Sequence, residues 1–233
     1  MFGDGKRPTL GWTLGRHGVL AWVVFNISLL ALLVMAAAFP VVAEKPIRIL
    51  MLGDSLTSGH GLIKGESIPD RLQEALQTAA GKMLAGARVL NAGVSGDTTA
   101  GGRSRLAWSL AVRPDALIVA LGANDGLRGL APKQTFADLA AIMGKANKAG
   151  IPVLLAGMRA PPNLGKEYGA AFDAVFPRLA ARHGIGLFPF LLAGVAAKPD
   201  LNQDDGIHPN RPGVTIMVDR IVPHVVRLLQ TLE

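Results

Sequence analysis

The residues of this chain that are best suited to chemistry are a serine, a histidine and an aspartate. Ser55 follows an apolar segment, and Asp205 lies three residues before His208 in a polar loop. A serine hydroxyl is a weak nucleophile unless a neighbouring base takes its proton, and histidine is a suitable base near neutral pH. An aspartate that accepts the second ring N–H fixes the tautomer of the histidine. We therefore predict that Ser55 is a nucleophile, that His208 is its base and that Asp205 orients His208.

Attack by a serine on a carbonyl also requires hydrogen-bond donors for the oxyanion that forms. The candidate donors are the backbone N–H groups of Ser55 and Gly96 and the side-chain amide of Asn124. Glycine lets the backbone come close to a substrate, and asparagine supplies a neutral donor. Taken singly, each of these residues also suits a turn or a helix cap. The prediction therefore depends on their occurring together.

Other kinds of site find less support in the sequence. His60 is a rival base because it is near Ser55, but we expect it to be a wall of the pocket. The chain has no cysteine, which excludes disulfides, thiolate zinc sites and a cysteine nucleophile. The acidic residues and histidines lack a metal-binding spacing, and neither a phosphate loop nor a dinucleotide fingerprint occurs. We expect no metal and no organic cofactor.

The elements that must position these residues follow from the apolar pattern. Five short apolar segments predict strands, at 47–52, 88–92, 116–121, 152–157 and 186–190. Five amphipathic segments predict helices, at 69–80, 99–112, 134–149, 170–182 and 212–232. Apolar strands separated by helices are typical of a parallel α/β sheet covered on both faces.

Four small polar clusters follow the predicted strands. They comprise residues 53–56, 91–98, 122–125 and 204–210. Ligands of such sheets bind beyond the carboxyl ends of the strands. All the candidate residues for acyl transfer therefore fall at the edge where a site is expected.

Length and composition limit the possible classes of protein. The 233 residues, half of them hydrophobic, suffice for one domain with a sizeable core. The formal net charge is +7, but the basic residues are scattered and are not interleaved with aromatics. We expect no nucleic-acid partner. A mild attraction for anionic lipids or acyl-coenzyme A stays open.

Residues 1–43 form a segment separate from the expected hydrolase domain at 44–233. Lys6, Arg7 and Arg16 precede an apolar run at 19–43. This pattern indicates either a signal peptide cleaved after Ala43 or an uncleaved apolar helix that anchors the chain in a membrane. Either alternative places the domain outside the cytoplasm, in the periplasm or secreted, or held at the inner membrane.

The polar clusters, in this order, resemble the SGNH (GDSL) hydrolase superfamily. The motifs are Gly-Asp-Ser-Leu at 53–56, Ser-Gly-Asp-Thr at 95–98, Gly-Ala-Asn-Asp-Gly-Leu-Arg-Gly at 122–129 and Asp-Asp-Gly-Ile-His-Pro-Asn-Arg at 204–211. The resemblance covers the chain from about residue 47 onwards. It implies a three-layer, flavodoxin-like αβα sandwich with a five-stranded parallel sheet of order 2-1-3-4-5.

The same resemblance implies roles for individual residues. It assigns Ser55, Asp205 and His208 to the catalytic triad, and Ser55, Gly96 and Asn124 to the oxyanion hole. Its substrate-binding positions are Asp125 and Leu127 on one side of an acyl groove and Ala160 and Pro161 on the other. Ala160 is smaller than the residue expected there, which leaves the preferred acyl-chain length open.

The predicted function is that of a serine esterase or thioesterase of the arylesterase, acyl-CoA thioesterase or lysophospholipase type. Its partner is a small-molecule acyl ester or thioester, and the oligomeric state stays open. One alternative is a carbohydrate O-deacetylase on the same fold. Another is a non-catalytic envelope protein that binds lipid.

Overall fold

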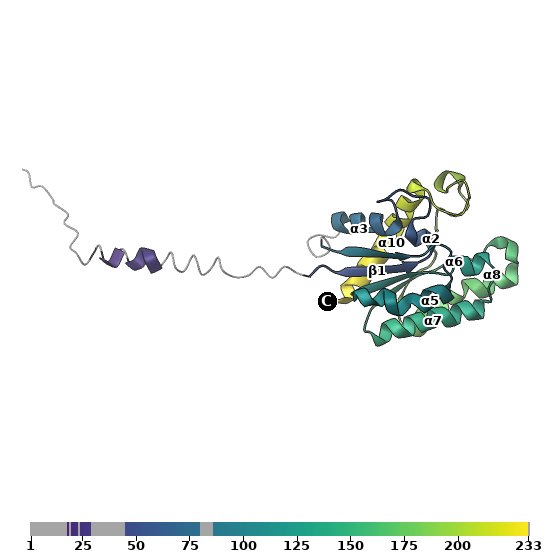
Figure 1. Ribbon diagram of the computed structural model, residues 1–233, viewed down its shortest axis with the longest axis horizontal. Coiled ribbons are helices and arrows are strands. Elements are labelled where there is room, and N and C mark those ends of the chain that lie inside the picture. Colours follow the sequence, from purple (N-terminus) through teal and green to yellow (C-terminus); the bar gives the residue numbers. More distant parts are fainter. Residues whose placement is uncertain (1–17, 19, 23, 29–44, 80–85, 233) are drawn as a thin grey trace, which may run out of the picture. The chain divides into compact units, whose positions relative to one another are not determined.

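The computed structural model describes residues 18, 20–22, 24–28, 45–79 and 86–232 (Figure 1). The chain divides into two units, residues 1–44 and 45–233. In the first unit the described residues are helical and exposed. Most of the expected apolar span at 19–43 lies outside the described residues, and no described helix is long and apolar enough to cross a membrane.

The second unit is built on a five-stranded parallel sheet. Its strands are β1 (Arg48–Gly53), β2 (Arg88–Gly93), β3 (Ala116–Ala120), β4 (Val153–Ala156) and β5 (Gly186–Phe188). Their order is β2-β1-β3-β4-β5, and every neighbouring pair is parallel. All five residues of β3 are buried, as a strand covered on both faces requires. The predicted sheet and its strand order are confirmed.

Helices pack on both faces of the sheet and complete the predicted three layers. Figure 1 shows α3 and α10 on one side of the sheet and α5 and α7 on the other. Contacts join α3 to α10, α5 to α7, and α7 to α9. The long helices are α3 (Ile68–Ala79), α5 (Thr99–Ser109), α7 (Pro132–Lys148), α8 (Lys166–Asp173), α9 (Val175–His183) and α10 (Arg211–Leu229). Short 3₁₀ turns are η1 (Leu110–Val112), η2 (Pro162–Leu164), η3 (Pro199–Leu201) and η4 (Gln230–Leu232).

The helix predicted at 170–182 is two helices, α8 and α9, which meet at Ala174. Pro177 lies in the first turn of α9. Because proline has no N–H, it cannot donate to the carbonyl of Asp173, four residues earlier, and the hydrogen-bonding pattern is interrupted there. The Asp173 carboxylate instead accepts the backbone N–H of Ala160 at 2.9 Å.

Two short helices were not predicted, and both begin where a strand ends. They are α2 (Ser55–Ser58), after β1, and α6 (Ala123–Leu127), after β3. Four or five residues are too few to show helical periodicity. These helices carry Ser55 and Asn124, so they determine where the candidate site forms.

Candidate active site

Ser55 begins helix α2 directly after β1. The Asp54 side chain caps this helix by accepting the N–H of Leu56 at 3.0 Å. The turn packs tightly against the strand ends, because a Cβ on Gly53 would overlap the side chain of Thr57. A Cβ on Gly93, at the end of β2, would likewise overlap the backbone of α2. Glycine at both positions allows α2 to sit against the end of the sheet, with Ser55 in its first position.

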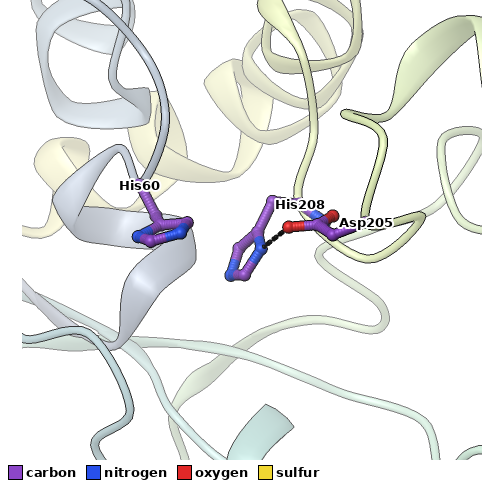
Figure 2. Close-up of side chains that lie close together, drawn as sticks. All are labelled: His60, Asp205 and His208. Carbon is purple, nitrogen blue, oxygen red and sulfur yellow. Dashed lines mark hydrogen bonds and ion pairs between the residues drawn. The ribbon is translucent and has the colours of Figure 1, made fainter.

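Ser55, His208 and Asp205 form a continuous chain of hydrogen bonds. Nε2 of His208 lies 2.9 Å from Oγ of Ser55, and Nδ1 of His208 lies 2.6 Å from Oδ2 of Asp205. Figure 2 shows the second of these hydrogen bonds. The other Asp205 oxygen, Oδ1, accepts the backbone N–H groups of Ile207 and His208, each at 3.0 Å. Residues 153 positions apart in sequence are thereby brought into direct contact.

Asp205 is held in its charged form. The hydrogen bond to the His208 side chain, followed by the two backbone N–H donors, lowers the pKa of Asp205 from 3.8 to about 2. A carboxylate that accepts the proton on Nδ1 leaves a lone pair on Nε2. That lone pair faces the hydroxyl of Ser55, so the arrangement can accept a proton from Ser55.

The candidate oxyanion donors lie in the loops that follow β1, β2 and β3. In the described part of the chain, the backbone N–H groups of Ser55 and Gly96 donate no hydrogen bond. Nδ2 of Asn124 donates to the carbonyl of Asp97 at 3.0 Å. An amide nitrogen carries two protons, so this contact occupies one and leaves the other for a ligand. Gly96 has a φ of +82°, a conformation that favours glycine.

We expect Asn124→Ala to lower kcat by roughly 10² to 10³-fold, the usual cost of losing one oxyanion donor. Because Asn124 also holds the carbonyl of Asp97, thermal unfolding of the variant should be measured beside its kinetics. A variant that is folded and keeps the kcat of the wild type would remove Asn124 from the oxyanion hole.

Asp54 is a buried acid directly before the candidate nucleophile. Its side chain is fully buried, and Oδ2 has no partner among the described residues. Burial raises the pKa of Asp54 from 3.8 to about 6, against the opposing effect of the Leu56 N–H. The unfolded carboxyl ionises at a lower pH than the folded one. The contribution of Asp54 to stability is therefore complete below pH 3.8 and is lost as the pH rises through about 6.

We expect Asp54→Asn to remove this part of the pH dependence while keeping an acceptor for Leu56. Between pH 4 and 7 the wild type should lose about 2 kcal/mol of unfolding free energy relative to the variant, from the shift between the two pKa values. Urea unfolding of both proteins across this range measures the difference. Stability curves that stay parallel would mean that Asp54 ionises as easily in the folded chain as in the unfolded one.

The four predicted substrate-binding residues lie in different settings. The Asp125 carboxylate is buried and accepts the N–H of Thr99 at 2.9 Å and the hydroxyls of Thr99 and Thr135 at 2.5 and 3.2 Å. These hydrogen bonds join α5 and α7 to α6 through the Asp125 side chain, and a role of Asp125 beside the substrate stays a prediction. Leu127 is half exposed.

Ala160 and Pro161 belong to the loop between β4 and η2. A Cβ on Gly126, in α6, would lie 3.5 Å from Pro161. The loop and α6 are therefore neighbours, as two sides of one groove would be. Both residues are partly exposed.

Two arginines at the site were missed by sequence reasoning. Arg105 donates to Asp97 at 2.6 Å and to the carbonyl of Gly53 at 2.8 Å, which joins the loop after β2 to the end of β1. Arg128 donates to the carbonyl of Gly96 at 2.9 Å. Each arginine donates to a backbone carbonyl far away in the sequence, and the sequence pattern does not show which carbonyl that is.

The chain is similar to known lipases, acylhydrolases and esterases. The GDSL-like lipase/acylhydrolase family matches residues 51–216. The chain is 40% identical to "Esterase TesA" of Pseudomonas aeruginosa over 182 residues, 78% of this chain and 89% of that one. It is 38% identical to "Thioesterase 1/protease 1/lysophospholipase L1" of Escherichia coli strain K12 over 172 residues, 73% of this chain and 79% of that one. Among solved structures, AlinE4, an SGNH-hydrolase family esterase, is 44% identical with a TM-score of 0.66, covering 80% of this chain and 98% of that one.

Proposed function

The chain belongs to the GDSL-like lipase/acylhydrolase family, and we propose that it hydrolyses acyl esters and thioesters through a covalent intermediate on Ser55. The observation that carries this assignment is the hydrogen-bonded series from Ser55 Oγ through His208 to Asp205. A binding protein has no need of a nucleophile, a base and unpaired N–H donors in one place.

In the proposed reaction, Nε2 of His208 takes the hydroxyl proton as Oγ of Ser55 forms a bond to the acyl carbon. The negative charge that develops on the carbonyl oxygen is stabilised by the N–H groups of Ser55 and Gly96 and by the amide of Asn124. Collapse of this intermediate expels the alcohol or thiol, which receives the proton from His208. Water then attacks the acyl-enzyme with His208 again as base, which releases the acid and restores the hydroxyl.

Apolar side chains around the site favour an acyl group of more than two carbons. Val94 and Ile207 belong to the loops that carry Gly96 and His208, and Leu127 belongs to α6, which carries Asn124; their exposed fractions are 46%, 48% and 50%. Exposed apolar side chains on the elements that carry a site are suited to contact an apolar ligand. An acetyl group is too small to contact three such residues.

The proposed activity is tested with p-nitrophenyl esters and acyl-CoA thioesters of graded length, with Ser55→Ala as the inactive control. We expect turnover to extend to medium or long acyl chains. Turnover limited to acetyl esters would support the carbohydrate O-deacetylase instead. No turnover of any ester or thioester by the folded wild type would support the non-catalytic alternative.

We also propose that residues 1–43 export the hydrolase domain to the periplasm or beyond it. The basic residues followed by the apolar run at 19–43 support this proposal. Mass spectrometry of the protein recovered from a bacterial envelope distinguishes the two forms. Cleavage after Ala43 gives a chain that begins at Glu44, whereas an anchor leaves the full chain in the membrane fraction. Recovery of the full chain in the cytoplasm would contradict export.

A further inference from the structure

A second histidine lies against the base of the proposed triad. The ring of His60 is 4.5 Å from the ring of His208, measured between centroids, with 43° between the ring planes. One potential ligand atom from each of His60, Asp205 and His208 lies within 4.8 Å of the other two, and Figure 2 shows the three side chains in this cluster. Proton transfer from Ser55 needs only His208 and Asp205, so the reaction does not account for His60.

The two histidines are held near each other by Gln203. Its Nε2 donates to the backbone carbonyl of His60 at 2.7 Å and to that of Pro209 at 3.0 Å. Its own backbone N–H donates to the carbonyl of His208 at 2.7 Å. Gly61, after His60, has a φ of +72°, and a Cβ there would overlap the side chain of Gln203. These hydrogen bonds and this close packing hold the loop that carries His60 against the loop that carries His208.

The ligand atoms suit one class of ion. Two imidazole nitrogens and a carboxylate oxygen, with a further position open to water, form a ligand set typical of Zn²⁺ and also suited to Cu²⁺. Neighbouring ligands of tetrahedral Zn²⁺ lie about 3.4 Å apart when each bond is about 2.1 Å long. The three candidate ligand atoms lie within 4.8 Å of one another, so small rotations of the side chains suffice to bring them to these separations. The side chain of His60 is exposed, and its ring donates and accepts no hydrogen bond among the described residues.

We propose that His60, together with His208 and Asp205, binds Zn²⁺ or a similar ion, and that the bound ion reversibly inhibits the enzyme. The inhibitory part rests on the proposed function. Both ring nitrogens of His208 are used by the triad, Nε2 by Ser55 and Nδ1 by Asp205. An ion at Nε2 takes the lone pair that would accept the Ser55 proton. An ion at Nδ1 leaves the remaining ring proton on Nε2. A protonated Nε2 has no free lone pair, so His208 can no longer take the proton of Ser55.

The test compares the full-length wild type with His60→Phe and His60→Gln, neither of which offers an imidazole. ZnCl₂ is titrated into each protein by calorimetry and into its hydrolysis assay, with rates normalised to the metal-free rate of the same variant. We expect stoichiometric Zn²⁺ binding and inhibition of the wild type, reversed by a chelator. Both His60 variants should bind Zn²⁺ at least about 10-fold more weakly. Removing a group that is hydrogen-bonded to a metal ligand lowers metal affinity by about 10-fold or more, and removing the ligand itself should lower it at least as much.

Two controls make the test specific. His224 lies in α10 and packs against Phe188, so His224→Phe removes a histidine elsewhere and should leave Zn²⁺ binding unchanged. Mg²⁺ prefers oxygen ligands and should not inhibit. Equal Zn²⁺ affinities of the wild type and both His60 variants would overturn the proposed site. Calorimetry needs no turnover, so failure of the proposed function and failure of the metal site can be told apart.

Discussion

Replacing Ser55 with alanine should lower kcat by on the order of 10⁴-fold or more, since the acyl-enzyme can no longer form. The hydroxyl stands 2.9 Å from Nε2 of His208, and no other hydroxyl in the described residues contacts that nitrogen. The loss should appear in kcat against both esters and thioesters, because both substrates share the same attacking atom. Steady-state kinetics on one ester and one thioester of equal acyl length measures it.

The control for Ser55→Ala is Ser104→Ala. Ser104 is an exposed serine of α5 whose hydroxyl, among the described residues, bonds only to the carbonyl of Gly101. This control should keep the activity of the wild type, and Ser55→Ala should unfold at nearly the wild-type temperature because a partly exposed hydroxyl contributes little to stability. Substantial activity remaining in folded Ser55→Ala would assign the nucleophile to another residue.

Asp205→Asn should lower kcat by about 10⁴-fold by imposing the wrong tautomer on His208. Oδ1 of Asp205 accepts two backbone N–H groups, so the oxygen of an asparagine amide must take that place. Its NH₂ group then faces Nδ1 of His208 and donates to it. A ring nitrogen that accepts there carries its own proton on Nε2, so His208 cannot accept the proton of Ser55.

Asp204→Asn is a matched control for this substitution. Asp204 is the exposed neighbour of Asp205, and its side chain makes no hydrogen bond or ion pair among the described residues. The same change of acid to amide should therefore leave kcat unaltered there. Folded Asp205→Asn with a kcat within a few fold of the wild type would show that His208 needs no carboxylate partner.

The sheet could be predicted from the sequence because its strands are continuous apolar segments. Burial on both faces of β1 and β3 requires such segments, and helices of eight or more residues separate the strands. The short helices α2 and α6 could not be predicted, because they are set by caps and glycine contacts at the strand ends. The interruption between α8 and α9 had a signal, Pro177, which the helical periodicity around it concealed.

The candidate site was partly predictable for a related reason. Parallel strands place their carboxyl ends at one edge, so polar residues after the strands were expected to meet there. Which way a side chain points from a short helix is not encoded in that pattern. Asn124 and Asp125 are neighbours in α6, yet Asn124 stays partly exposed while Asp125 is buried against Thr99. The contact of His60 with His208 depends on Gln203 and on two loops, which no local motif describes.

Labelling with a fluorophosphonate probe, followed by peptide mapping, tests most directly whether the hydroxyl at the start of α2 is activated by the imidazole beside it. We expect one phosphonyl group per folded chain, attached to Ser55. The label should be absent after denaturation and in the Asp205→Asn variant during the same exposure. A folded wild type that takes up no label, or carries it on a different residue, would show that Ser55 is not the activated nucleophile.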